Sequence, residues 1–279
     1  MTSEAKAFAP ANISCIFRVY GHKNPRWMGS YGAGFTLNEG VVASASKSSK
    51  TGVYFNNKKI DLPSVEKTIK KLTDKKIKIK IKAKLPLGCG FGLSGASALA
   101  AAYAANELLN LKKTRKELAI IAHTAEVESK TGLGDVINQL YGGFCVKLKP
   151  SSYFIVKKLP IKNKEVYCRY FGKIPTKSII TNRNLIKNIN NSAEISMNKI
   201  QGLMRQNKKI RFKEIIGISR EFAVSSGLLK DEKTMKTIKE IEKNNGNASM
   251  IMLGNAVFSD KPFKGAIKLK IMDKGAHIL

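Results

Sequence analysis

The glycine-rich run at residues 85–97 is the segment whose residue types and spacing best suit chemistry. Its sequence, LPLGCGFGLSGAS, combines four closely spaced glycines with two serines, Ser94 and Ser97, and it precedes an alanine-rich segment. Glycines let a backbone approach a ligand closely and adopt positive φ, so that consecutive N–H groups can face an anion. A helix that begins here adds the positive end of its dipole, whereas a tight turn with a serine cap would need fewer glycines. The run therefore predicts a phosphate-binding loop.

Two widespread phosphate loops fit this run poorly. No Gly-Lys-Ser or Gly-Lys-Thr follows the glycines, which excludes a Walker A loop. Residues 90–95 match the GxGxxG pattern of dinucleotide-binding folds, but the preceding strand alternates Lys with Ile, and a central parallel strand would be apolar throughout. The acid that would bind a ribose is also missing, because the nearest candidate, Glu107, falls inside the predicted helix. The dinucleotide-binding interpretation is therefore disfavoured.

Two carboxylates, Glu126 and Asp135, follow the loop. Glu126 shares a helix face with Ala119 and Ala122, so its carboxylate is expected to be partly buried and to need a cation. Taken alone, Glu126 could be a surface acid and Asp135 a helix cap. Beside a phosphate loop in an acid-poor chain, metal binding and catalysis are favoured. Phosphoryl transfer uses Mg²⁺ to bridge the phosphates and a carboxylate to orient the attacking hydroxyl.

The elements that must position these groups alternate between strands and helices. Residues 76–84 (KIKIKIKAK) alternate with period two, which predicts a strand with Ile on one face and Lys on the other. The alanine-rich segment 94–109 predicts a closely packed helix, and Thr114 with Glu117 forms a capping box for a helix over 115–128. Further helices are expected at 63–72, 136–140, 184–205, 212–225 and 233–243, and further strands at 144–148, 153–157, 166–171, 248–252 and 265–270. Both halves of the chain mix α and β.

The composition limits the classes of protein that remain. The chain has 279 residues, of which 43% are hydrophobic, enough for one or two folded domains and too many for a disordered chain. We find no long apolar run and no N-terminal apolar segment of the signal-peptide kind, so neither a membrane span nor a leader is expected. The four cysteines are scattered, which argues against a disulfide scaffold or a structural zinc site. These features predict a cytoplasmic globular protein.

The net charge of +30 favours acidic partners. Of the 50 basic residues 42 are Lys, and they are spread along the whole chain. Lysine is typical of a solvated surface, whereas bidentate recognition of phosphates and bases generally uses Arg. These features favour a lysine-rich solvated surface over dedicated nucleic-acid binding, and the expected partner is a small-molecule substrate, with neither nucleic acid nor a membrane.

The loop and the acidic segment together resemble those of the GHMP small-molecule kinases, whose phosphate loop is usually written P-x-G-x-G-L-G-S-S-A-A. The segment PLGCGFGLSGASALA matches its proline and three of its glycines, with Phe91 in place of Leu and Leu93 in place of the first serine. Segments 9–14, 132–143 and 248–258 resemble other blocks of the family and occur in the same order. The resemblance implies an α+β, GHMP-kinase-like two-domain architecture with ATP in the cleft. Its N-terminal half (1–165) would be of the ribosomal-protein type and its C-terminal half (166–279) ferredoxin-like.

Carried over residue by residue, the resemblance implies ATP and Mg²⁺ as cofactors. The predicted contacts to ATP are Pro86, Gly88, Gly90, Phe91, Gly92, Leu93, Ser94, Gly95 and Ala96. The predicted catalytic set is Ser94 and Glu126, which would hold Mg²⁺, with Asp135, which would orient or deprotonate the substrate hydroxyl. Glu128 is the alternative to Glu126 as metal ligand.

Within the family, segments 29–41, 122–136 and 252–258 resemble the archaeal pantoate kinases in particular, which make 4-phosphopantoate from pantoate and ATP on the route to coenzyme A. The predicted substrate contacts are Asn12, Arg26, Ser30 and Gly134. Many members carry Lys where this chain has Asn12, so a cation that acidifies the alcohol must come from elsewhere, with Arg26 and Lys130 as candidates. Arg26, just before the 29–34 turn, is also the candidate for the substrate carboxylate.

Two other functions stay open at the level of sequence. One is a GHMP kinase that acts on another small alcohol of the homoserine or mevalonate type. The other is a basic nucleic-acid-binding protein on a kinase scaffold, which would have no need of the set Ser94, Glu126 and Asp135. The sequence does not determine the oligomeric state, and a homodimer is one candidate.

Overall fold

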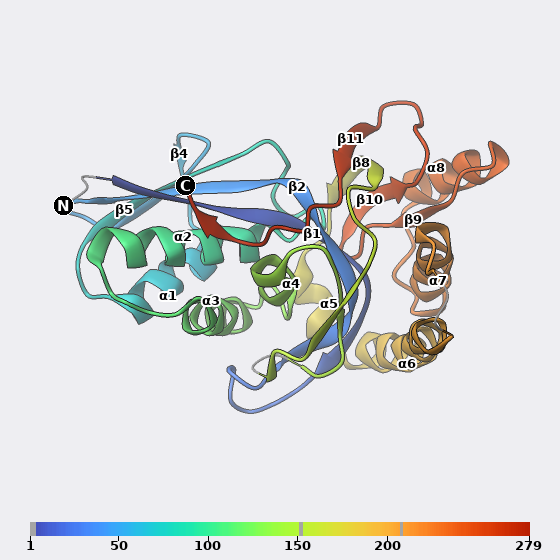
Figure 1. Ribbon diagram of the computed structural model, residues 1–279, viewed down its shortest axis with the longest axis horizontal. Helices are drawn as coiled ribbons and strands as arrows, with labels where there is room; N and C mark the ends of the chain where they lie inside the picture. The colour runs from blue at the N-terminus through green and yellow to red at the C-terminus, as the bar shows by residue number, and fades with distance from the viewer. Residues whose placement is uncertain (1–3, 151–152, 207–208) are drawn as a thin grey trace.

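The structure, a computed structural model, describes residues 4–150, 153–206 and 209–279. Figure 1 shows a sheet with its helices at one end of the molecule and a smaller sheet with further helices at the other. In chain order the elements are β1 (Glu4–Tyr20), β2 (Gly29–Lys47), β3 (Gly52–Phe55), β4 (Lys58–Lys59), α1 (Pro63–Leu72), β5 (Ile77–Ala83), α2 (Leu93–Leu109), α3 (Arg115–Ser129), α4 (Asp135–Tyr141), β6 (Phe144–Lys147), β7 (Val156–Leu159), β8 (Glu165–Lys173), α5 (Thr176–Ile180), α6 (Arg183–Arg205), α7 (Phe212–Ser225), α8 (Glu232–Lys243), β9 (Ala248–Met250), β10 (Gly254–Ser259), β11 (Ile267–Lys270) and β12 (His277–Ile278).

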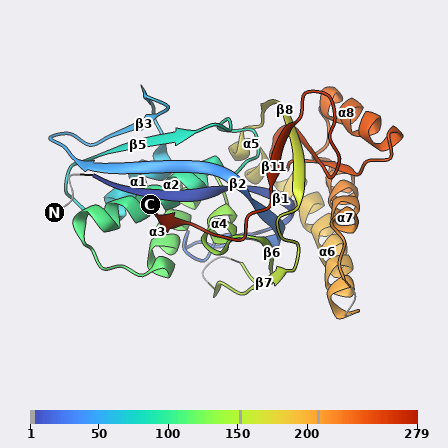
Figure 2. The same ribbon diagram turned by 45° about the horizontal axis from the view of Figure 1, so that its top comes forward.

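The larger sheet is built on β1 and β2, two long antiparallel strands. Its strand order is β12-β1-β2-β5-β3-β4, and β6 pairs with β2 and carries β7. Helices α1 to α4 cover one face of this sheet (Figures 1 and 2). The register of β1 shifts between Pro10 and Asn12 and again between Ser14 and Ile16. Such bulges bend a strand and re-aim its side chains, and these two bracket the polar pair Asn12 and Ser14.

Two helices and a strand follow directly from their sequence patterns. In β5 the isoleucines Ile77, Ile79 and Ile81 are buried and the lysines between them face away, as the alternation predicts. Helix α2 is buried along nearly its whole length and contacts β1, β2, α1 and α3, because its alanines allow neighbours to approach closely on every side. The capping box predicted for Thr114 and Glu117 is present at the start of α3.

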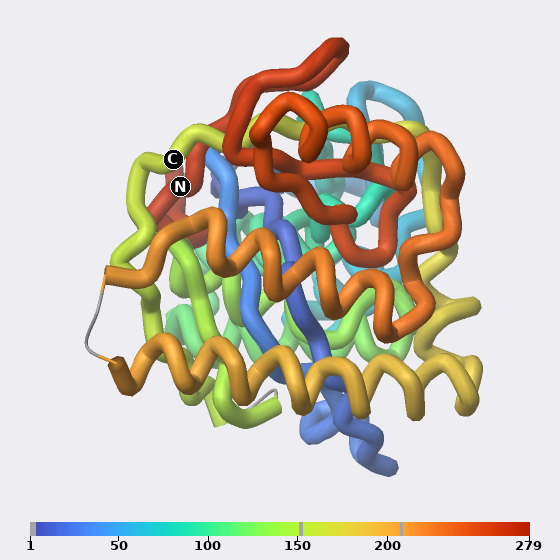
Figure 3. The backbone as a smooth tube through the Cα atoms, turned by 90° about the vertical axis from the view of Figure 1, so that its right-hand side faces the viewer, coloured from blue at the N-terminus to red at the C-terminus, as the bar shows by residue number. Residues whose placement is uncertain are grey.

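The smaller sheet has the order β11-β8-β10-β9. Figure 3 shows α6 and α7 running side by side along this end of the molecule, and both pack on β1. The two ends of the molecule share one continuous hydrophobic core, and a small separate cluster lies beneath α8. At the end of the chain β12 returns to the larger sheet, where Ile278 pairs with Ala7 of β1. The predicted boundary between the two halves, at residues 165/166, assigned β12 to the C-terminal half. That boundary stays a prediction.

Most predicted elements are confirmed, and the exceptions have physical reasons. The strand expected at 153–157 begins later, as β7, and residues 151–152 lie outside the described ranges. The long strands β1 and β2 were not predicted, because β1 is buried on both faces and its bulges interrupt the period of two. The short helix α5 was also missed. None of the helices in the described ranges has the length and apolar character that crossing a membrane requires.

Candidate active site

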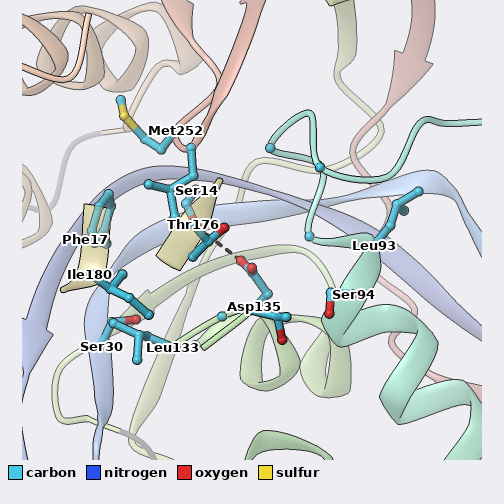
Figure 4. Close-up of a pocket in the computed structure, with 17 residues that line it drawn as sticks. Ser14, Phe17, Ser30, Leu93, Ser94, Leu133, Asp135, Thr176, Ile180 and Met252 are labelled. Carbon is cyan, nitrogen blue, oxygen red and sulfur yellow. Dashed lines mark hydrogen bonds between the residues drawn. The ribbon is translucent and has the colours of Figure 1, made fainter. Parts of the chain in front are cut away.

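A cavity lies where the glycine loop, the bulged part of β1, the start of α4 and helix α5 meet (Figure 4). Gly88, Gly90, Gly92 and Ser94 line its loop side. Phe17, Ser30, Leu133 and Ile180 lie on the other side, with Asp135 between the two groups. We call these the phosphate end and the substrate end of the cavity.

The phosphate end is a backbone structure. Gly88, Gly90 and Gly92 have φ values of +81°, +85° and +62°, a region that favours glycine. A Cβ at Gly90 would lie 2.7 Å from Cγ2 of Ile251, so the loop packs tightly on the turn after β9. Gly92 is the N-cap of α2, and no side chain caps this helix. The alternative of a tight turn capped by a serine is therefore wrong, and the uncapped first residues of α2, Leu93 and Ser94, line the cavity.

Asp135 is the first residue of α4 and lines the middle of the cavity. Its Oδ1 accepts a hydrogen bond from Nδ2 of Asn12 at 2.7 Å and one from Oγ of Ser14 at 3.3 Å. Asn12 is fully buried, and its own Oδ1 accepts from Nδ2 of Asn138 at 3.0 Å. Asn12, which was predicted to contact the substrate, thus donates a hydrogen bond to the carboxylate of Asp135, the candidate catalytic residue. The interpretation of Asp135 as a helix cap is wrong, because Gly134 occupies the N-cap.

Lys147, the last residue of β6, is the cation beside Asp135. Its side chain is buried, with 6% of the residue exposed, and Nζ donates to the carbonyl of Gly134 at 2.8 Å. A Cβ at Gly134 would overlap both this Nζ and Oγ of Ser30, so either side chain would have to move to accommodate a larger residue. Burial lowers the pKa of Lys147 to about 8, and the negative charge of Asp135 opposes this shift.

The charge state of Asp135 follows from its surroundings. Loss of hydration raises the pKa of Asp135, and the Lys147 ammonium and the hydrogen bonds from Asn12 and Ser14 hold it down. The carboxylate is therefore more basic than an ordinary Asp while a neighbouring cation balances its charge. The sequence contained one signal for Lys147: it directly follows the apolar run 144–146 in the strand predicted after Gly142-Gly143.

Glu126 is buried behind the phosphate end, with 1% of the residue exposed, so the interpretation as a surface acid is wrong. Its Oε1 accepts from Oγ1 of Thr131 at 3.2 Å, and its Oε2 has no hydrogen-bond partner among the described residues. Burial, and next the charge of Asp135, raise the pKa of Glu126 to about 8, while the hydroxyls of Ser94 and Thr131 act in the opposite direction. A buried, incompletely partnered carboxylate near a serine hydroxyl suits a hard cation such as Mg²⁺.

The structure does not bring every predicted residue to the cavity. Arg26 is exposed in the loop between β1 and β2, with its Cζ 5.7 Å from the centroid of the Trp27 ring. Lys130 is exposed at the end of α3. Glu128 lies on the outer side of α3, where its carboxylate pairs with Lys71 at 2.8 Å. Arg26 and Lys130 thus do not line the cavity, and the buried cation near Asp135 is Lys147.

The remaining predicted residues lie on the cavity lining, in the glycine loop or at the start of α2. Ser30, Gly134 and Leu93 line the cavity, while Phe91 and Ala96 are buried beneath it and Pro86 is half-buried at its start. Gly95 lies in α2 beside Glu126, since a Cβ there would be 2.8 Å from Oε2. A residue that was not predicted, Ser64 of α1, is hydrogen-bonded through Oγ to Oγ of Ser94 at 2.9 Å.

Comparison with known proteins agrees with this geometry. The family described as GHMP kinases N terminal domain matches residues 63–143, a stretch that holds the glycine loop, Glu126 and Asp135. A pantoate kinase of Methanocaldococcus jannaschii is 36% identical over 90% of each chain. The chain belongs to the pantoate kinase family of GHMP kinases. A second relative of the kinase, the pantoate kinase of Methanospirillum hungatei, is 32% identical over 98% of this chain and 96% of its own.

Solved structures share the fold of the kinase. One, described as a phosphotransferase related to the CoA biosynthesis pathway, has a TM-score of 0.83, 26% identity and coverage of 99% and 98% of the two chains. A homoserine kinase from Cytophaga hutchinsonii has a TM-score of 0.68 at 20% identity and covers 100% and 98%. The α+β architecture expected from the resemblance is thereby confirmed.

Proposed function

We propose that this ATP-dependent kinase phosphorylates the primary alcohol of pantoate, giving 4-phosphopantoate for coenzyme A biosynthesis. The observation that carries the proposal is the position of Asp135 between a phosphate loop and an apolar substrate end, with Lys147 buried behind Gly134, in a chain 36% identical to a pantoate kinase. The geometry supplies each group that the reaction needs, as follows.

Asp135 positions the attacking oxygen. One of its carboxylate oxygens is held by Asn12 and Ser14, so the other side of the carboxylate can accept a hydrogen bond from the substrate hydroxyl. The alcohol oxygen then forms a bond to the γ-phosphorus, the bond from phosphorus to the bridging oxygen breaks, and ADP leaves with that electron pair. The alcohol proton passes to Asp135, whose raised pKa makes it a better acceptor than an ordinary Asp. Orientation supplies most of the acceleration.

The phosphate end stabilises the charge that develops on the transferred group. The loop at Gly88–Gly92 and the uncapped N-terminus of α2 present N–H groups and a positive dipole end to that side of the cavity. Ser94 and Glu126 are the residues that would hold Mg²⁺, and the incompletely partnered Glu126 carboxylate supports this assignment. When bound there, Mg²⁺ neutralises charge on the phosphates.

The substrate end suits a substrate that carries a carboxylate and no ammonium group. Ser30 and Gly134 line it, and the Lys147 ammonium lies directly behind them, so the carboxylate of pantoate would meet a hydroxyl and a positive charge. Asp135 is the one ionisable side chain among the described residues that line the cavity. No second acid is therefore present on the lining to bind the ammonium group of homoserine, which disfavours that alternative.

Product identification tests the proposal. The purified kinase is offered ATP and Mg²⁺ with pantoate, mevalonate, homoserine or no acceptor, and ADP release is followed together with the phosphorus NMR spectrum of the product. We expect release that depends on pantoate and a phosphomonoester coupled to the protons of one CH₂ group. Phosphorylation of the secondary hydroxyl, or release that is independent of the acceptor, would contradict the proposal.

A further inference from the structure

The substrate end of the cavity has an apolar wall next to the candidate catalytic carboxylate. Phe17, Ile180 and Leu133 line this end, and in Figure 4 they lie together on the side of Asp135 opposite to Ser94. Each is nearly enclosed, with 6% of the residue exposed. Their side chains thus form an apolar surface at this end of the cavity.

The wall is assembled from three distant parts of the chain and is held in place from behind. The ring of Phe17, on β1, packs edge-on against Phe222 of α7 at 5.8 Å between centroids, and Phe222 is fully buried. Ile180 is the last residue of α5, and α5 packs on α6. Leu133 stands in the turn between Glu126 and Asp135. Because its side chains are packed from behind by neighbouring elements, the wall has a defined shape rather than an adaptable one.

We propose that Phe17, Ile180 and Leu133 are specificity-determining residues that recognise a fully substituted carbon next to the phosphorylated CH₂OH group. This inference rests on the proposed function. In pantoate the carbon bonded to that CH₂OH carries two methyl groups, so an oxygen beside Asp135 places both methyl carbons three bonds from the reacting oxygen. Homoserine has a bare CH₂ group at this position and would leave the wall without contact.

The expected discrimination follows from the burial of two methyl groups. A missing methylene in an apolar pocket typically costs ~10-fold or more in kcat/KM. We therefore expect pantoate to be preferred by about 100-fold over 2,4-dihydroxybutanoate, which keeps both hydroxyls and the carboxylate and lacks both methyls. Because the carboxylate, the secondary hydroxyl and the primary alcohol are shared, the ratio isolates the contribution of the wall.

The experiment compares kcat/KM for these two acceptors in the wild type and in Ile180→Ala, at saturating Mg²⁺ and ATP. Ile180→Ala is expected to reduce the preference for pantoate by ~10-fold, through a larger loss for pantoate than for the smaller acceptor. Ile179→Ala is the matched control, because Ile179 belongs to the same helix turn and lines a different cavity with Ile174 and Leu185. The control is expected to keep the wild-type ratio.

The outcomes separate this inference from the proposed function. If the wild type phosphorylates pantoate but accepts 2,4-dihydroxybutanoate equally well, or if Ile180→Ala keeps the wild-type ratio, the wall is not a specificity determinant and the proposed function stands. If the wild type does not phosphorylate pantoate, both fail. Should Ile180→Ala not fold, Ile180→Val removes one methylene, and an unchanged ratio in that variant overturns the inference.

Discussion

The two ends of the active-site cavity are built in different ways. On the phosphate end the cavity is lined by one contiguous segment, residues 88–94, whose glycines adopt positive φ. The substrate end is lined by side chains from β1, β2, the turn before α4 and α5, which are distant in sequence, and Lys147 of β6 lies behind it. The phosphate-binding part of the site can therefore be recognised from one short stretch of sequence, whereas the choice of substrate depends on how distant segments pack together.

Removing the carboxylate that stands between the two ends should have the largest effect. Asp135→Ala is expected to lower kcat by ~10²–10⁴-fold, because the alcohol loses both its orientation and its proton acceptor. The KM for ATP should change little, since Asp135 is not part of the glycine loop. Steady-state ADP release measures both constants. Glu128→Ala, which removes a carboxylate on the outer side of α3, is the matched control, and an equal loss in both variants would contradict the assignment.

Removing the charge of Lys147 should affect the substrate end next most strongly. Lys147→Met is expected to lower kcat/KM for pantoate by ~10–100-fold, the usual cost of losing a charged hydrogen-bond partner. Binding of a nucleotide analogue, measured by calorimetry, should be unchanged. A Lys147→Met variant with weakened nucleotide binding and normal use of pantoate would place Lys147 at the wrong end.

The same lysine predicts a pH dependence. With its pKa at about 8, the ammonium is present below that pH and is lost as the pH rises through it. The value of kcat/KM for pantoate should therefore fall above pH 8, at saturating Mg²⁺ and ATP. Lys147→Arg should move this fall to higher pH, because a guanidinium stays charged. An unshifted pH profile in Lys147→Arg would show that another group titrates.

A substitution in the glycine loop should act on the phosphate end alone. Gly90→Ala places a Cβ at positive φ and 2.7 Å from Ile251, so we expect ~10-fold weaker binding of ATP and a free energy of unfolding lower by ~1–3 kcal/mol. Calorimetry and thermal unfolding provide the two measurements. Gly217→Ala is the control, because a Cβ on that α7 residue meets nothing within 4 Å and alanine favours a helix. Equal nucleotide affinity in Gly90→Ala and the wild type would contradict the role of the loop.

The smallest effect is expected from replacing Arg26, which was predicted from the sequence to bind the substrate carboxylate. Arg26→Ala should leave the KM for pantoate within about twofold of the wild type, the range of a typical exposed substitution. The structure places Arg26 in an exposed loop over Trp27 rather than on the cavity lining. A large rise in KM would mean that this loop folds over the substrate.

The contrast between the two ends also explains how far the sequence could predict the site. The loop and the elements α1, α2, α3, α7 and β5 were predicted, because periodicity, caps and glycine spacing are local signals. Glu126 and Asp135 were recognised as candidates from their neighbours in the chain. The cation was not, since Lys147 approaches Asp135 only through the pairing of β6 with β2.

Asn12 illustrates the same limit. Its position in the sequence suggested contact with substrate, yet the bulges of β1 direct its side chain to Asp135. The wall of Phe17, Ile180 and Leu133 likewise required α5, a five-residue helix with no amphipathic signal, to be placed at the same cavity as β1. Such placements depend on the packing of the whole molecule.

The most direct test of the central claim is the ratio of kcat/KM for pantoate to that for homoserine, measured by ADP release with the wild-type kinase. The two acceptors share a primary alcohol and a carboxylate and differ in the methyl groups and the ammonium, the features that the substrate end should distinguish. We predict a preference for pantoate of at least ~100-fold, from the apolar wall together with the positive charge of Lys147. A ratio near one, or a preference for homoserine, would contradict the account.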